Sequence, residues 1–184
     1  AAAALHALAR LWRLSPGVVD LAHIALTLGA DVPMCVAGHP ALVSGIGECL
    51  APGPPLPAFS MLLANPGVAV STPIVFAHRS GPFSDPAQIT AQPADAMALA
   101  KLLGTRRNDL EAAAERVAPE ISAVRAALAA TPGALLARMS GSGATCFAIY
   151  ADQGQAEAAR ETLAKRNPGW WLAAAPVARF SRSG

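Results

Sequence analysis

The chain has 184 residues, 53% of them hydrophobic and 14% charged, and a formal net charge of +2. So many apolar residues can form a buried core, which excludes wholesale disorder. The small excess of Lys and Arg is not gathered into a dense basic stripe, so we expect no nucleic-acid partner. The most apolar region, residues 18–38, is interrupted by Asp20, His23, Asp31 and Pro33, so we expect no membrane-spanning helix.

The cysteines and histidines carry no metal-binding pattern. Cys35, Cys49 and Cys146 are odd in number and lack the spacing of zinc ligands, and the four histidines are scattered along the chain. We expect a reduced, cytoplasmic chain whose own residues form no metal site.

The first elements in chain order are two helices. Residues 1–13 place their leucines on one helical stripe, and residues 16–28 predict a second helix with Ser15 as its N-cap and Gly29 after its end. The first helix has neither an N-cap residue nor an initiator methionine before it. We therefore expect these residues to be a piece of a longer protein.

Extended chain is expected after the second helix. Residues 30–33 should leave that helix in extended form, because a residue that precedes proline avoids helical geometry. Two short strands are expected at residues 41–44 and 48–50, on either side of a glycine-rich turn.

A proline-rich segment is the best candidate for a linker. Residues 51–57 contain four prolines, which resist both a helix and a central strand. We expect one domain in residues 1–54 and a second in residues 55–184.

The second domain alternates strand and helix patterns, which predicts an α+β fold with an antiparallel sheet. Residues 72–78 fit either a helix or a strand, and residues 82–93 fit a loop. The expected strands are 60–64, 134–139, 144–150 and 170–175, and the expected helices are 94–103, 110–117, 120–130 and 153–166.

Asp31 is a candidate general base. It follows the second predicted helix on a backbone that Gly29 and Pro33 restrain, and a general base needs such fixed placement to reach a substrate hydroxyl. Turn aspartates are common, so the spacing by itself favours a capping role.

A Ser-Gly loop precedes the predicted strand at 144–150. Gly141 and Gly143 flank Ser142, and the exposed amides of such a loop can hold an anion such as phosphate. A plain glycine turn between two strands explains the same residues. The loop is not a P-loop, because no Gly-Lys-Ser/Thr follows, and it lacks the spacing of a nucleophile elbow. A serine hydrolase built on Ser142 therefore ranks low.

Two further segments carry candidate residues. Thr72 offers a hydroxyl shortly after a turn, and Phe76 offers a ring that could stack a base, although a core position is more usual for phenylalanine. Asn108 or Asp109 predicts an N-cap for the helix that follows.

In combination, the chain resembles the GHMP kinase superfamily. The segments that carry the resemblance, in the expected order, are Gly29-Ala30-Asp31-Val32-Pro33, Asn65-Pro66-Gly67 with Ser71-Thr72, Asn108-Asp109-Leu110-Glu111 and Ser140-Gly141-Ser142-Gly143-Ala144. The first and third of these separate one branch from the homoserine, galactose and mevalonate kinases. Members of that branch phosphorylate the 2-hydroxyl of 4-diphosphocytidyl-2-C-methyl-D-erythritol in non-mevalonate isoprenoid (terpenoid) synthesis.

The resemblance implies a fold, partners and roles. The fold is a GHMP kinase C-terminal domain with a ferredoxin-like antiparallel sheet, plus a remnant of an N-terminal ATP-binding domain similar to ribosomal protein S5. The partners are ATP, its associated Mg²⁺ and a small-molecule substrate, in a monomer or weak homodimer. The matching residues are Asp31 for the catalytic aspartate, Thr72 and Phe76 for contacts with substrate and cytosine, and Gly141, Ser142 and Gly143 for a loop near the phosphates.

Other features of the superfamily are absent from these 184 residues. The sequence contains neither the glycine-rich ATP loop nor the catalytic lysine expected near the N-terminus, nor the histidine and tyrosine that help to bind cytidine. We therefore expect the chain to be the C-terminal part of such a kinase and to be inactive alone. The alternatives are another small-molecule GHMP kinase, of the homoserine or mevalonate type, and a non-catalytic domain that kept the scaffold.

Overall fold

The chain forms two compact units of mixed helix and sheet. The computed structural model describes residues 1–15, 20–85, 89 and 92–177. One unit is built on Ala1–Pro55 and the other on Leu56–Gln88 and Gln92–Arg179. Both contain helices and antiparallel strands, so the predicted α+β class is confirmed. No helix within the described ranges is long and apolar enough to cross a membrane.

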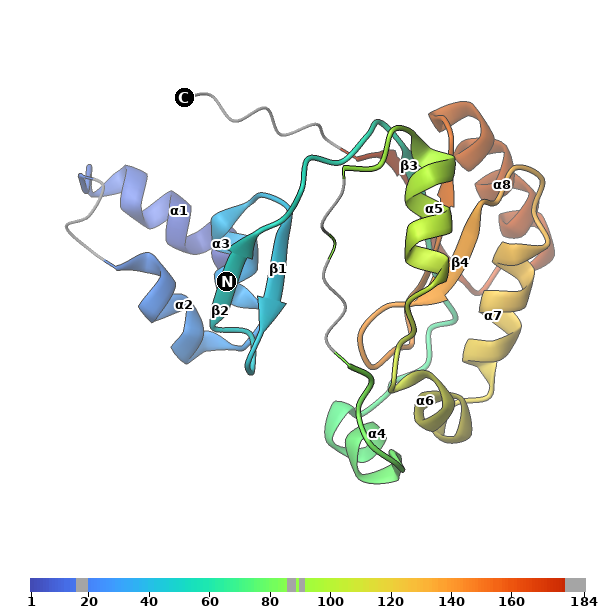
Figure 1. The fold of residues 1–184 in the computed structure, drawn as a ribbon, viewed down its shortest axis with the longest axis horizontal. Coiled ribbons are helices and arrows are strands. Elements are labelled where there is room, and N and C mark those ends of the chain that lie inside the picture. The colour runs from blue at the N-terminus through green and yellow to red at the C-terminus, as the bar shows by residue number, and fades with distance from the viewer. Residues whose placement is uncertain (16–19, 86–88, 90–91, 178–184) are drawn as a thin grey trace. The chain divides into compact units, whose positions relative to one another are not determined.

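The first unit combines three helices with a hairpin (Figure 1). Its elements are α1 (Ala2–Leu11), α2 (Leu21–Leu28), α3 (Val32–Ala37), β1 (Ala41–Ser44) and β2 (Cys49–Pro52). The two strands pair antiparallel, as the sequence predicts. Gly47 follows the tip of the hairpin with φ of +120°, and a Cβ added there would lie 2.2 Å from the Ala30 carbonyl oxygen. Glycine is required at this position because the turn approaches the α2–α3 connection so closely.

Two predictions for the first unit need correction. The second helix begins at Leu21, where the Asp20 side chain accepts a hydrogen bond from the His23 amide at 3.0 Å; residues 16–19 of the predicted helix lie outside the described residues. The extended backbone predicted for residues 30–33 is wrong, because α3 begins at Val32. Pro33 occupies the first turn of α3, where a missing amide proton costs no helical hydrogen bond.

A four-stranded antiparallel sheet forms the centre of the second unit. Its strands are β3 (Ser60–Asn65), β4 (Leu136–Met139), β5 (Cys146–Tyr150) and β6 (Trp171–Pro176), in the order β4-β5-β3-β6. All neighbours pair antiparallel, as predicted. Along β3 buried side chains alternate with half-buried ones, so both faces of the sheet are covered.

Helices cover both faces of this sheet (Figure 1). The helices of the second unit are α4 (Thr72–His78), α5 (Ala96–Gly104), α6 (Glu111–Val117), α7 (Glu120–Ala129) and α8 (Gln153–Arg166). Of these, α5, α7 and α8 pack on the sheet, whereas α4 and α6 pack against each other. On one face, α7 and α8 pack against Leu62 of β3. On the other, Leu99 of α5 packs with Ile149 of β5. The ambiguous segment at 72–78 is therefore a helix.

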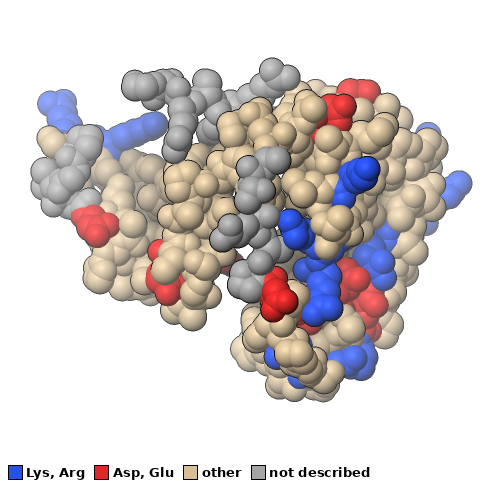
Figure 2. Space-filling model, in the orientation of Figure 1, with Lys and Arg blue, Asp and Glu red and all other residues tan. Residues whose placement is uncertain are grey.

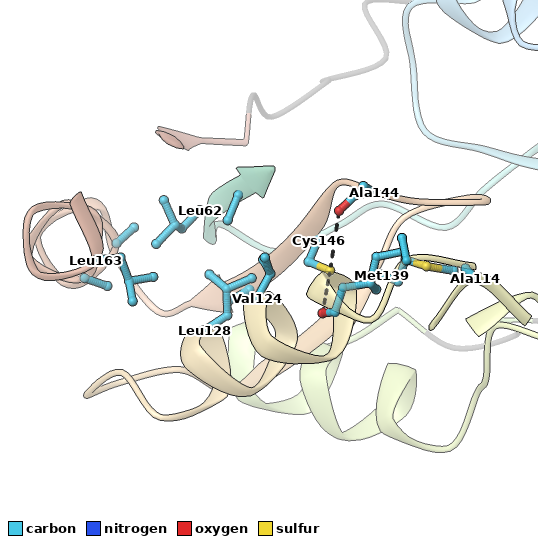
Figure 3. Close-up of a cluster of buried hydrophobic side chains, with 14 of the residues drawn as sticks. Leu62, Ala114, Val124, Leu128, Met139, Ala144, Cys146 and Leu163 are labelled. Carbon is cyan, nitrogen blue, oxygen red and sulfur yellow. Dashed lines mark hydrogen bonds between the residues drawn. The ribbon is translucent and has the colours of Figure 1, made fainter. Parts of the chain in front are cut away.

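The larger core contains mainly small and aliphatic side chains. Figure 3 shows Val124 and Leu128 of α7 facing the sheet, near Leu62 and Cys146. The Cys146 thiol donates weakly to the carbonyl oxygens of Ile121 and Ala144 at 3.8 and 3.9 Å. This core joins α7 to the end of β5 that carries the Ser-Gly loop.

Candidate functional site

The Ser-Gly loop is the turn between β4 and β5. The Ser140 amide donates to the Thr145 carbonyl at 2.9 Å, and the Gly143 amide donates to the Ser140 carbonyl at 3.0 Å. Gly141 and Gly143 have φ of +54° and +87°, a backbone region that favours glycine. The interpretation as a glycine turn between two strands is confirmed. The amides of Gly141 and Ser142 have no acceptor among the described residues, so the turn also presents free donors.

Helix α4 brings Thr72 to the loop. The hydroxyls of Thr72 and Ser142 lie 2.7 Å apart, within hydrogen-bond distance. Phe76 stands one turn further along, on the same side of the helix as Thr72, and its side chain is 49% exposed. The core position favoured for Phe76 is therefore wrong, and the ring is accessible to a ligand. These contacts unite two sequence-predicted residues, Thr72 and Ser142.

Asn108 also contacts the loop. Its Nδ2 donates to the carbonyl oxygens of Gly141 at 2.7 Å and Met139 at 3.3 Å. Its Oδ1 accepts from the Leu110 amide at 3.0 Å. The predicted capping role for Asn108 or Asp109 is wrong, because Leu110 occupies the N-cap position of α6 and no side chain caps it. Sequence reasoning missed this contact because the partners lie more than thirty residues apart.

Asp109 anchors the segment that follows α4. Its carboxylate accepts from the amide and the hydroxyl of Ser84, each at 2.7 Å, and from Arg107 at 2.7 Å. The pKa of Asp109 lies below its usual range. The largest cause is the hydrogen bond from the Ser84 amide, followed by that from the Ser84 hydroxyl, and Arg107 lowers the pKa further. Asp109 is thus a structural carboxylate with its acceptors already used.

The second unit carries charged side chains of both signs on its surface. Figure 2 shows blue and red side chains next to one another on the second unit. Arg125 lies 2.9 Å from Glu115, and Arg138 donates to the Arg106 carbonyl.

Asp31 belongs to the first unit, whereas Thr72, Phe76 and the loop glycines belong to the second. It precedes α3 at the N-cap position, its backbone is helical, and its side chain makes no capping hydrogen bond. It is exposed, and no ion pair or hydrogen bond occupies its carboxylate within the described ranges. The capping role favoured by the spacing is therefore wrong, and the carboxylate is free for another role.

The described residues contain no group of three or more His, Cys, Asp or Glu side chains that could hold a metal ion. A divalent cation that keeps several waters and binds through ligand phosphates needs no such cluster.

Comparison with known proteins shows which families and structures the chain is similar to. Residues 91–169 match the family described as GHMP kinases C terminal. The computed structure resembles a crystal structure of a 4-(cytidine 5'-diphospho)-2C-methyl-D-erythritol kinase, with a TM-score of 0.70 and 33% identity over 94% of this chain and 62% of that one. It shares its fold with a homoserine kinase from Cytophaga hutchinsonii, with a TM-score of 0.58 and 18% identity over 82% of this chain and 51% of that one. The chain is thus similar to the GHMP kinases, and residues 91–169 match their C-terminal domain.

Curated relatives point to one member of that family. The chain is 50% identical, over 96% of its length, to 4-diphosphocytidyl-2-C-methyl-D-erythritol kinase from Paramagnetospirillum magneticum. It is 48% identical over 94% of its length to the kinase of the same name from Rhodospirillum rubrum. The chain spans 62% and 57% of the length of these two relatives.

Proposed function

We propose that this chain is part of a kinase that transfers the γ-phosphoryl group of ATP to the 2-hydroxyl of 4-diphosphocytidyl-2-C-methyl-D-erythritol. The observation that carries the proposal is the 50% identity, over 96% of this chain, to a kinase of that name. Among the residues that match the motifs of the family, Asp31, Phe76 and the Ser-Gly loop have free polar or aromatic groups in the structure, which supports the same activity.

Asp31 is proposed to accept the proton of the attacking hydroxyl or to orient that hydroxyl. Its carboxylate is exposed and carries no cap or ion pair. In the transfer, the hydroxyl oxygen forms a bond to the γ-phosphorus, the bond to the β,γ-bridging oxygen breaks, and ADP leaves. Positioning and charge stabilisation dominate such reactions, so one fixed carboxylate contributes mainly by placing the nucleophile.

Phe76 and Thr72 are proposed to bind the substrate. The half-exposed ring of Phe76 offers an apolar face on which cytosine can stack, and stacking of a base on an aromatic ring contributes about 1–3 kcal/mol. Thr72 lies on the same side of α4 and touches Ser142, which places a polar group between the ring and the loop.

Gly141, Ser142 and Gly143 are proposed to lie near the phosphates. The free amides of Gly141 and Ser142 are donors of the kind that hold phosphate oxygens. ATP is the expected phosphoryl donor, and Mg²⁺ bound to its phosphates would neutralise their charge. The described residues form no metal cluster of their own, so the phosphates of ATP would hold the ion.

The two units are proposed to correspond to two domains of the kinase. Residues 1–54 would be part of the ATP-binding domain and residues 55–184 the C-terminal domain. We further expect a cytoplasmic protein that is a monomer or a weak homodimer.

The test is a substrate panel with the full-length gene product. We expect ATP-dependent phosphorylation of the diphosphocytidyl substrate, read as ADP release and as a new phosphomonoester by ³¹P NMR. Mevalonate and homoserine serve as matched acceptors from the same family. Phosphorylation of either of these, with none of the cytidyl substrate, would contradict the proposal.

A further inference from the structure

Asn108 connects the start of α6 with the turn between β4 and β5. Its amide nitrogen donates to the carbonyls of Gly141 and Met139, and its oxygen accepts from the Leu110 amide. Donors and acceptor are therefore all engaged within the protein, which fixes the orientation of this half-buried side chain.

The hydrogen bond to Gly141 also sets the direction of the next amide. The Gly141 carbonyl and the Ser142 amide belong to one planar trans peptide unit, so they point in opposite directions. Because Asn108 holds the carbonyl, the Ser142 amide points away from Asn108. That amide has no acceptor among the described residues.

The hydrogen bond from the Gly143 amide to the Ser140 carbonyl closes the turn, but it uses neither the Gly141 carbonyl nor the Ser142 amide. A Cβ added to Gly141 would meet no atom within 4 Å, so packing does not fix the backbone there. The contact between Thr72 and Ser142 joins their hydroxyls and leaves the peptide plane free to rotate. Glycine adopts many backbone conformations, so without Asn108 the Ser142 amide would sample several directions.

We propose that Asn108 is a positioning residue, which aims the Ser142 amide at a phosphate group of the bound ligand. This inference rests on the proposed kinase function, in which the loop lies near the phosphates. A donor that is already oriented needs no reorganisation when charge develops on the transferring group. Asn108 acts through the loop and does not itself touch the phosphate.

The kinetic test compares Asn108→Asp, Asn108→Ala and Asn167→Asp in the full-length gene product. Asn108→Asp keeps the size and the acceptor of the side chain but cannot donate to Gly141. Asn167→Asp is the matched control, because Asn167 Nδ2 also donates to a backbone carbonyl, that of Leu163 at 3.3 Å, at the end of α8. We expect both Asn108 variants to lose about 10–100-fold in kcat, with KM for the acceptor within about threefold. The control should stay within about twofold of the parent kcat.

A spectroscopic test separates this inference from the proposed function. Inorganic triphosphate is titrated into the 184-residue chain while the Ser142 amide resonance is followed by NMR. We expect the chemical shift of that resonance to change on titration in the parent and in Asn167→Asp, and to stay unchanged in Asn108→Ala. A native circular dichroism spectrum of Asn108→Ala shows that this variant is folded. A Ser142 amide that does not respond in the parent overturns the positioning role, as do Asn108 variants with parental kcat. A responding amide in a protein without activity on the cytidyl substrate overturns the proposed function instead.

Discussion

Asp20 and Asp31 are two aspartates that precede helices in the first unit and differ in what their side chains do. Asp20 caps α2 through the His23 amide, whereas Asp31 leaves the N-terminus of α3 uncapped. The Asp31 carboxylate takes no part in the fold and is therefore available for chemistry. Asp20 does take part in the fold, so it serves as the control for substitutions of Asp31.

Replacing Asp31 with alanine should abolish most activity without affecting the fold. In the full-length gene product we expect kcat to fall by about 10²–10⁴-fold, because the proposed proton acceptor or orienting charge is lost. Asp20→Ala should instead retain kcat and lower the free energy of unfolding by about 1 kcal/mol through the lost cap. Steady-state kinetics and urea titrations check both, and equal activity in Asp31→Ala and the parent would remove Asp31 from the mechanism.

Cys146 should be the least reactive of the three thiols. It is buried, and burial raises the pKa of its thiol to about 11, whereas Cys35 and Cys49 are exposed. Titration of the native chain with a thiol reagent at pH 8 should label Cys35 and Cys49 quickly and Cys146 only on unfolding. Rapid labelling of Cys146 in the native chain would show that the core around α7 opens readily.

The raised pKa of Cys146 also sets a pH dependence of stability. An unfolded cysteine ionises near pH 8.5, so between about pH 8.5 and 11 the unfolded chain binds fewer protons than the folded chain. The contribution of this thiol to stability is complete below that window and falls as pH rises through it, by up to about 1.4 kcal/mol per pH unit. Replacement of Cys146 by alanine should reduce the slope of unfolding free energy against pH.

At the scale of elements, the Ser-Gly loop packs closely against α7 at Gly143 but not at Gly141. A Cβ on Gly143 would lie 2.9 Å from Ile121 Cδ1 and 3.1 Å from Met139 Sδ, whereas a Cβ on Gly141 would meet open space. Both glycines have positive φ, so both substitutions carry backbone strain.

Gly143→Ala should therefore destabilise the chain more than Gly141→Ala. We expect a cost of about 1–2 kcal/mol from positive φ in either variant. Gly143→Ala should add about 1–3 kcal/mol, because the new methyl group overpacks the contact with α7. Urea unfolding of the 184-residue chain measures the difference, and equal losses in the two variants would mean that Ile121 and Met139 move aside without cost.

The elements that could be predicted are those specified by local sequence. Helix α8 has the predicted bounds, Gln153–Arg166, because Asp152 caps its first turn. The α3 helix was missed because a proline after Val32 both disfavours a preceding helix and suits a helical first turn, and sequence alone does not choose. The exposed position of Phe76 and the contacts of Asn108 depend on where distant elements pack, so no local pattern signals them.

At the scale of the whole molecule, the two units differ in how much they bury. Almost all of the buried apolar side chains belong to the second unit, on both faces of its sheet. Among the described residues of the first unit, Ala25, Pro33 and Gly47 are buried, and Leu11 and Trp12 are more than half exposed. Burial of apolar surface is the main favourable term in folding, so stability should be concentrated in the second unit.

Residues 56–179 should accordingly fold without residues 1–55. We expect this fragment to unfold in a single cooperative urea transition, with the amides of β3 and β5 the slowest to exchange with solvent. In the 184-residue chain, amides of α1 and α2 should exchange fastest, because few apolar contacts would be broken when these helices open. The matched control is a fragment of residues 1–55, which should lack a cooperative transition. A fragment of residues 56–179 that remains unfolded, while the 184-residue chain unfolds in one step, would show that the units stabilise each other and that the sheet core alone is insufficient.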